Sequence, residues 1–264
     1  MNKVEAILND YYDNYDEDSR LIRDKAHRVE YITTTTYIEK YLKKGDRILE
    51  IGAGTGRYSI TYAEKGYRVD AVELVNKNLD ILRSKITDKM NINAIQGNCL
   101  DLNMYDNNTF DITLVLGPLY HLYDDETAKK AINEAIRVTK RNGKIFLAYI
   151  TNDAVVLSYG LRKGNIKRLK ELCDENWNIK KIPEEIFSTY KINDFDKLMK
   201  NFNVNKLETI ATDGICANMQ DYINELDDEG YDIYIDFHLK NCKRKDLIGY
   251  SNHILEIVEK IWRK

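Results

Sequence analysis

The first 45 residues place apolar side chains at helical spacing. Two groups of residues show this spacing: Ile22, Ala26, Val29 and Ile32, and then Tyr37, Ile38, Tyr41 and Leu42. This spacing puts them along one face of a helix, and Gly45 is typical of a helix end. The pattern predicts a helical segment over residues 1–45, which we expect to act as a lid over the rest of the chain.

From residue 46 the pattern changes to short apolar runs that alternate with amphipathic stretches. The runs typical of buried strands are residues 47–51, 67–74, 91–96, 110–116 and 144–150. The stretches typical of helices are residues 57–65, 78–85 and 125–141. Strands that alternate with helices in this way form a parallel sheet with helices on both faces. We therefore expect an α/β core over residues 46–150.

The second half of the chain departs from this rhythm. Residues 151–203 and 215–247 are charged and amphipathic, with Pro183 inside the first segment, and they predict helical insertions. The segments 204–214 and 248–264 contain the strand-like runs 204–212 and 254–258, which we expect to complete the sheet. Insertions of this size commonly cover a binding cleft. We interpret residues 1–264 as a single domain with two helical caps.

Composition narrows the class of partner. Lys and Arg number 40 and Asp and Glu number 43, for a net charge of -3, so nothing favours a nucleic-acid partner, whose binding depends on basic patches. The four cysteines lack metal-ligand or redox spacing. No apolar run reaches the roughly 18 residues of a membrane span, and the N-terminus has no apolar signal core. We expect a cytoplasmic protein, monomeric or homodimeric, without a membrane partner.

A glycine-rich turn follows the first predicted strand. Residues 48–57 read Ile-Leu-Glu-Ile-Gly-Ala-Gly-Thr-Gly-Arg. Glycines permit a tight turn whose backbone approaches a ligand closely, and the helix that follows offers free N–H groups to an anion. Dinucleotide sites use Gly-x-Gly-x-x-Gly. Here Arg57 occupies the place of the third glycine, which disfavours a dinucleotide.

The form Glu50-x-Gly52-x-Gly54-x-Gly56 resembles instead the motif of class I, Rossmann-like S-adenosylmethionine-dependent methyltransferases, of the bacterial small-molecule type. Glu73 at the end of the second strand and Asn98 after the third extend the resemblance. Residues 11–15, 117–122 and 249–253 also resemble segments of such proteins. The resemblance implies a Rossmann-like, seven-stranded, mostly parallel sheet with helices on both faces. It also implies S-adenosyl-L-methionine as cofactor and S-adenosyl-L-homocysteine as product.

The resemblance assigns roles to individual residues. Glu73 would accept both ribose hydroxyls, Asn98 would contact the adenine amino group, and Leu74 and Leu116 would sandwich the adenine ring. Arg23, Arg28 and Arg57 are alternatives for the methionyl carboxylate. The full set expected to contact the cofactor is Tyr11, Glu50, Gly52, Ala53, Gly54, Gly56, Glu73, Leu74, Gly97, Asn98, Cys99 and Leu116.

The acceptor is expected just beyond the fourth strand, at the carboxyl edge of the sheet. Tyr120 and His121 lie there and are the first candidates for lining the reaction centre. Alternatively, His121 holds its loop by a hydrogen bond. His238 and His253, near the second insertion, are further candidates for contacting the acceptor. A base is needed only if the acceptor must lose a proton.

Tyr11, Tyr12 and Tyr15 give two alternatives of equal weight. They could cover the cofactor as part of a lid, or they could pack as one face of a short helix.

Missing motifs restrict the reaction further. Residues 116–119 read Leu-Gly-Pro-Leu, not the Asn/Asp-Pro-Pro-Tyr/Phe of enzymes that methylate nucleic-acid or glutamine amino groups. Carboxylates suited to magnesium are absent there, so we expect no metal. The sequence therefore predicts a methyltransferase for the O or N atom of a small-molecule acceptor. An RNA or protein methyltransferase and a non-catalytic module that binds S-adenosylmethionine remain as alternatives.

Overall fold

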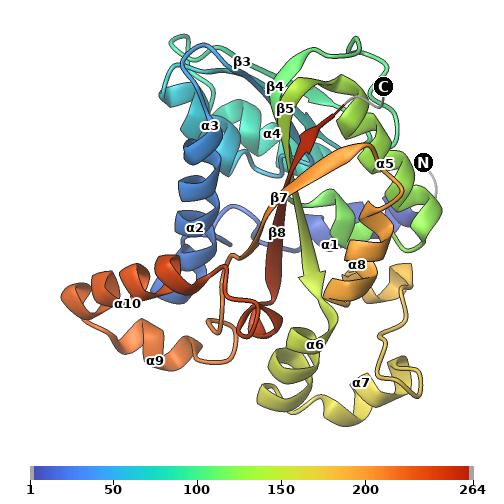
Figure 1. The fold of residues 1–264 in the computed structure, drawn as a ribbon, viewed down its shortest axis with the longest axis vertical. Coiled ribbons are helices and arrows are strands. Elements are labelled where there is room, and N and C mark those ends of the chain that lie inside the picture. The colour runs from blue at the N-terminus through green and yellow to red at the C-terminus, as the bar shows by residue number, and fades with distance from the viewer. Residues whose placement is uncertain (1–2, 262–264) are drawn as a thin grey trace.

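One mixed sheet forms the centre of the protein (Figure 1). The computed structural model describes residues 3–261. Among these, the strands run in the order β3-β2-β1-β4-β5-β8-β7, and β6 pairs with β5 beside this path. The strands are β1 (Arg47–Ile51), β2 (Arg68–Glu73), β3 (Ile92–Gln96), β4 (Phe110–Val115), β5 (Thr139–Thr151), β6 (Thr189–Tyr190), β7 (Val204–Ala211) and β8 (His253–Lys260).

The pairing of the strands is mostly parallel. β1 to β5 pair in parallel, and β8 is antiparallel to both β5 and β7. The central strands are covered on both faces; in β1, for example, Ile48, Leu49 and Ile51 are fully buried. Such burial explains why these strands are continuous apolar runs. The Rossmann-like sheet expected from the sequence is confirmed, and the register between β7 and β8 shifts between Lys206 and Glu208.

Helices cover the sheet and its carboxyl edge. Asp24, Asp124 and Asp227 cap three of them by accepting backbone N–H groups at 2.8–2.9 Å. The helices are α1 (Lys3–Asp13), α2 (Lys25–Tyr41), α3 (Arg57–Glu64), α4 (Asn76–Ser84), α5 (Asp125–Val138), α6 (Asn152–Val155), α7 (Ile166–Leu172), α8 (Ile192–Met199), α9 (Gln220–Glu225) and α10 (Asp228–Asn241). Within residues 3–261, none has the length and apolar character that a membrane-spanning segment requires.

The two insertions lie at the end of the sheet toward which β5 runs (Figure 1). The first contributes α6, α7 and α8. The second contributes α9 and α10, which pack on α2 through a small apolar cluster that includes Val29, Ile223 and Tyr231. The N-terminal helix α2 is thus packed against the second insertion. The segment between α1 and α2 borders a cavity.

Three predicted helix boundaries are wrong. The helix expected over 125–141 ends at Val138, because Thr139 already pairs with Phe110 of β4 and its hydroxyl contacts that of Thr113 at 2.7 Å. In the second insertion, expected to be helical from residue 215, the first helix begins only at Gln220, and residues 14–24 are not helical. Residues 139–141 are polar and residues 14–20 are mostly polar, without clear periodicity, so the sequence did not mark those two boundaries.

Candidate active site

A cavity of about 720 Å³ lies where the parallel strands end. It is bordered by residues after β1, β2, β3 and β4, by the segment between α1 and α2, and by both insertions. Its size is within the usual range for small-molecule sites. The predicted site residues that line it are Tyr11, Glu50, Gly52, Ala53, Gly54, Glu73, Leu74, Gly97, Asn98, Cys99, Leu116, Tyr120 and His121.

Gly56 is the one residue of the expected cofactor-contacting set that does not line the cavity. Its φ is 84°, and it precedes α3. A Cβ atom there would lie 2.1 Å from Cδ1 of Leu82 on α4. Gly56 therefore allows α3 and α4 to pack closely, which is a structural role.

The glycine turn itself adopts left-handed backbone angles. Gly52 has a φ of 70° and Gly54 a φ of 55°, and glycine tolerates both without strain. The N–H of Gly52 donates to the carbonyl of Val72 at 2.7 Å, which fixes the turn against β2. A Cβ on Gly52 would lie 2.7 Å from Cγ of Pro118, so the turn and the loop after β4 touch closely.

Glu73 sits beside this turn. Its carboxylate is buried and accepts the N–H of Gly54 at 2.7 Å and the N–H of Val75 at 2.8 Å. Burial raises the pKa of Glu73, while these two N–H donors oppose the rise. The carboxylate is thereby held at the end of β2, at the cavity wall, where the ribose contact is expected.

Glu50 connects the two elements on either side of the glycine turn. Its carboxyl group is buried and accepts a hydrogen bond from the Ser59 hydroxyl on α3. Burial raises the pKa of Glu50 to about 8, although the Ser59 hydrogen bond opposes the rise. It joins β1 to α3 and holds the first turn of that helix in position.

Asn98 and Cys99 line the cavity where adenine is expected. The side-chain oxygen of Asn98 accepts the N–H of Leu100 at 2.9 Å, and its amide nitrogen donates to Glu5 at 3.3 Å. Burial raises the pKa of Cys99 to about 12, so its thiol is not a nucleophile at neutral pH. Both residues shape the wall.

The segment between α1 and α2 crosses the glycine turn. Asp18 accepts the hydroxyl of Thr55 at 2.9 Å and also contacts Lys85. Lys85 donates to the carbonyl of Thr55 at 2.9 Å, and Arg57 donates to the carbonyl of Asp18 at 2.9 Å. Polar contacts thus tie this segment to the turn.

The arginines that line the cavity differ from those expected as partners of the methionyl carboxylate. Arg23 and Arg57 line the cavity, and Arg28 does not. Arg20, which the sequence analysis missed, also lines it and bonds Glu30 at 2.9 Å and Glu17 at 3.2 Å. No motif surrounds Arg20; a polar run in a predicted helical segment was the only signal.

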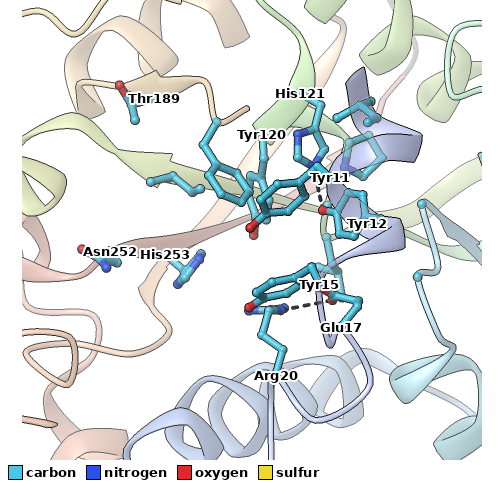
Figure 2. A pocket seen from close by; sticks show the side chains of 18 of the residues that line it. Tyr11, Tyr12, Tyr15, Glu17, Arg20, Tyr120, His121, Thr189, Asn252 and His253 are labelled. Carbon is cyan, nitrogen blue, oxygen red and sulfur yellow. Dashed lines mark hydrogen bonds and ion pairs between the residues drawn. The ribbon is translucent and has the colours of Figure 1, made fainter. Parts of the chain in front are cut away.

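Aromatic residues gather on one side of the cavity (Figure 2). The Tyr11 ring stacks on Tyr15 at 5.3 Å and meets Phe187 edge-on at 5.7 Å. The hydroxyl of Tyr12 is 2.9 Å from Nε2 of His121. The tyrosines of α1 and the segment after it therefore line the cavity wall.

Both nitrogens of His121 are engaged. Nδ1 is 3.0 Å from the carbonyl oxygen of Ile186 and so donates to it, which leaves Nε2 to accept the Tyr12 hydroxyl. Burial lowers the pKa of His121 to about 4. This geometry favours the alternative in which His121 holds its loop rather than acting as a base.

His121 should make stability fall in mild acid. Its pKa is depressed in the folded state, so the unfolded chain binds the proton more readily and stability is lost as pH falls below about 6.5. We expect the free energy of unfolding in urea to decrease by about 2 kcal/mol between pH 7 and pH 5 from this group alone. His121→Gln should remove that part of the slope. His27→Gln is the control, and an unchanged slope in His121→Gln would contradict the assignment.

The two further histidine candidates occupy different surroundings. Nε2 of His238 is 3.0 Å from the Thr33 hydroxyl, and His238 does not line the cavity. His253 does line it, and its Nδ1 is 2.8 Å from Asp213 and 3.5 Å from Glu30. The sequence analysis missed Asp213 and Glu30, which carry no motif.

Residues 48–143 match the family model described as a methyltransferase domain. This segment of the chain is therefore similar to a methyltransferase domain. The matched segment includes β1 to β4, α5 and the glycine turn. These are the elements whose carboxyl ends form the cofactor side of the cavity.

Known proteins resemble the methyltransferase domain and the fold around it. An uncharacterised methyltransferase of Mycobacterium tuberculosis is 32% identical over 126 residues, 48% of this chain and 46% of that protein. A demethylmenaquinone methyltransferase of Clavibacter sepedonicus is 24% identical over 61% of this chain and 62% of that protein. The chain thus spans less than two thirds of either relative.

A solved structure extends the similarity in fold. The S-adenosylmethionine-dependent methyltransferase of Methanosarcina mazei has a TM-score of 0.58 at 16% identity, over 86% of this chain and 98% of that one. The whole architecture, and not only the methyltransferase domain, is therefore of a known type.

Proposed function

We propose that the protein transfers a methyl group from S-adenosylmethionine to a small-molecule acceptor. The observation that carries the proposal is the convergence of the glycine turn, Glu73 and Asn98 on one cavity at the ends of three parallel strands. Ligands of α/β sheets bind at this edge. The methyltransferase domain match and the demethylmenaquinone methyltransferase relative support the reaction class and a small acceptor.

The residues present fit the proposed cofactor. Gly54 leaves space beside the turn, because a Cβ there would meet only the Glu17 side chain, at 3.6 Å. The Glu73 carboxylate is at the wall for the ribose hydroxyls, and Leu74 and Leu116 are available for the adenine. When bound, S-adenosylmethionine would supply an activated methyl group on its sulfonium. The chain's own part is to position the acceptor and to exclude water.

The pairing of cations at the cavity with carboxylates supports a small acceptor over RNA. Arg162, Lys163 and Arg168 of the first insertion line it. Arg162 pairs with Asp221 at 3.1 Å and Arg168 with Glu185 at 2.7 Å. Two of these three cations are thus already neutralised by carboxylates, which leaves little charge for a phosphate backbone.

Calorimetry tests the proposed cofactor. Titration with S-adenosylhomocysteine should give one binding site per chain, and titration with a nicotinamide dinucleotide should give no binding. Tight binding of the dinucleotide, or absence of S-adenosylhomocysteine binding, would overturn the proposal. Transfer of a deuterated methyl group to an added acceptor, read by mass spectrometry, would exclude a purely binding role.

A further inference from the structure

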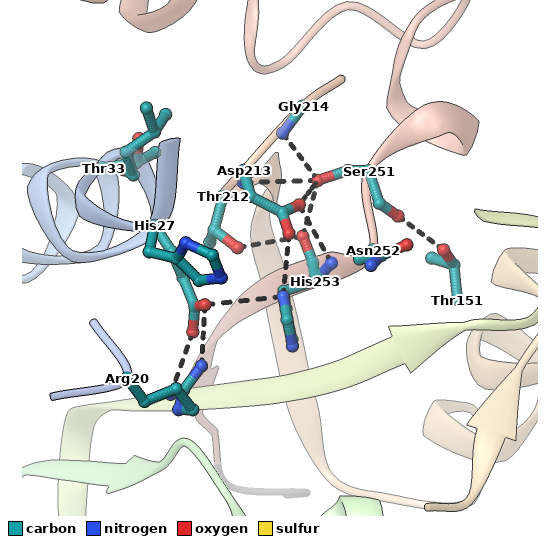
Figure 3. A network of polar contacts seen from close by, with 12 residues as sticks. Arg20, His27, Thr33, Thr151, Thr212, Asp213, Gly214, Ser251, Asn252 and His253 are labelled. Carbon is teal, nitrogen blue, oxygen red and sulfur yellow. Dashed lines mark hydrogen bonds and ion pairs between the residues drawn. The ribbon is translucent and has the colours of Figure 1, made fainter. Parts of the chain in front are cut away.

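A cluster of charged side chains borders the cavity away from the known motif (Figure 3). It joins four separate parts of the chain. Asp213 follows β7, His253 begins β8, Glu30 belongs to α2, and Arg20 lies between α1 and α2. The cluster is not accounted for by the glycine turn or by Glu73.

His253 is oriented by its carboxylate partners. Its Nδ1 is 2.8 Å from Asp213 and 3.5 Å from Glu30. Asp213 is itself held by the Ser251 hydroxyl and by the His253 N–H at 3.1 Å. Nε2 of His253 has no hydrogen-bond partner among residues 3–261. The His253 side chain is 19% exposed, and the residue lines the cavity. A histidine held in this way presents Nε2 to a bound molecule.

A second polar group without a partner lies next to His253. The Tyr120 ring is 5.7 Å from the His253 ring, and its hydroxyl is buried without a hydrogen-bond partner within the described chain. Buried polar groups are normally hydrogen-bonded. An orphaned hydroxyl and a free imidazole nitrogen on two neighbouring rings indicate that a polar ligand completes this part of the cavity.

The charges on the cavity wall near His253 favour the binding of a cation. Glu17, Glu30 and Asp213 are three carboxylates on the cavity wall, and Arg20 is the cation that bonds the first two. The excess of carboxylates would oppose the formation of a phenolate or alkoxide nearby, since like charges repel. Aromatic rings on the same wall also attract cations.

We propose that the acceptor is an amine that enters as its ammonium ion and that Nε2 of His253 removes a proton from it. This inference rests on the proposed function. The ammonium N–H bond breaks and its proton binds Nε2, so the nitrogen regains a lone pair. With S-adenosylmethionine bound, that lone pair would form the bond to the methyl carbon while the carbon–sulfur bond would break and leave its electron pair on sulfur. The imidazolium afterwards releases its proton to water.

The surroundings suit His253 for this proton. Burial by itself would lower the pKa of His253, but Glu30 and Asp213 outweigh it and raise the pKa, with Arg20 opposing them. The same contacts lower the pKa of Asp213, which therefore stays ionised. Asp213 and Glu30 act as positioning residues that stabilise the imidazolium.

A metal is a poorer explanation of the same groups. Glu30, Asp213 and His253 offer ligand atoms within 4.8 Å of one another. However, the guanidinium of Arg20 bonds both oxygens of Glu30, at 2.9 and 3.3 Å. Both Glu30 oxygens are therefore occupied by Arg20 donors, which leaves too few free ligand atoms for a metal, and we interpret the cluster as an ion-pair network.

Two probes of equal shape test the charge preference. Benzylamine and benzyl alcohol differ mainly in charge at pH 7, and calorimetry measures the affinity of each for the protein, with and without S-adenosylhomocysteine. We expect benzylamine to bind about 10-fold more tightly, a difference of about 1.4 kcal/mol. Equal affinity, or tighter binding of the alcohol, would overturn the inference. Absence of S-adenosylhomocysteine binding would instead count against the proposed function, and the amine preference could still be read on the free protein.

Variants test the residues. Asp213→Asn and Glu30→Gln should each reduce the preference for benzylamine several-fold, while Glu39→Gln, an exposed carboxylate on the same helix, should not. Unchanged thermal unfolding and S-adenosylhomocysteine affinity would show that the variants are folded.

Nuclear magnetic resonance of the four histidines tests the proton acceptor. The His253 signal, assigned with His253→Gln, should shift when benzylamine binds and should titrate at a lower pH in Asp213→Asn than in the native protein. A His253 signal that does not respond to benzylamine, or amine binding that is lost on treatment with EDTA, would overturn the inference.

Discussion

Replacing Glu73 by alanine is expected to weaken S-adenosylhomocysteine binding by at least about 100-fold. Each hydrogen bond to an ionised group contributes about 1.5–3 kcal/mol, and the ribose offers two hydroxyls to this carboxylate. The substitution also leaves the N–H groups of Gly54 and Val75 without their acceptor, 2.7 and 2.8 Å away in the native protein. The glycine turn would then lose part of its support.

Calorimetry of Glu73→Ala should be paired with a control. Asp80→Asn removes an exposed carboxylate from the neighbouring helix α4 and should bind S-adenosylhomocysteine as the native protein does. Thermal unfolding separates loss of the contact from loss of the fold. Native-like affinity in Glu73→Ala, with the fold intact, would show that the ribose is held elsewhere.

The second large effect is expected from Gly52→Ala. The φ of 70° costs an alanine about 1–2 kcal/mol, and its Cβ would meet the rigid ring of Pro118 at 2.7 Å. Overpacking of this kind typically costs about 1–3 kcal/mol more. We expect the free energy of unfolding to fall by roughly 2–5 kcal/mol in urea titrations.

Gly45→Ala is the matched control for this substitution. Gly45 has a φ of 89°, but no atom lies within 4 Å of where its Cβ would be. It therefore measures the cost of the backbone angle without the collision, about 1–2 kcal/mol. If the free energy of unfolding falls equally in the two variants, the collision between the new Cβ and Pro118 costs no stability. If they differ, the difference measures that contact.

The cofactor side of the cavity could be predicted from the sequence because each of its residues lies directly at the end of a predicted strand. The glycine turn follows directly on β1, and Glu73 ends β2. Parallel strands bring such ends to one edge whatever the rest of the chain does. Apolar runs buried on both faces likewise predicted the central strands to within a few residues.

The acceptor side was not readable in the same way. Glu30 lies on a helix among other polar residues, and Asp213 and His253 approach it only because β7 and β8 pair and α2 packs on the second insertion. His253 was a candidate from its position near an insertion, but nothing in the sequence linked it to Asp213. His121 stood in the expected loop, yet only the structure shows that Tyr12 and Ile186 occupy both of its nitrogens.

The outer strand β7 leaves one edge of the sheet without a partner strand among residues 3–261. An uncovered edge is a template for aggregation between chains. Here the register shift between Lys206 and Glu208 interrupts the strand, and Lys206 forms an ion pair with Asp196 at 2.6 Å and with the buried Glu256 at 2.8 Å. An irregular, charged edge is difficult for a second copy to extend. The same strand that brings Asp213 to the cavity thus also protects the protein from forming intermolecular sheets.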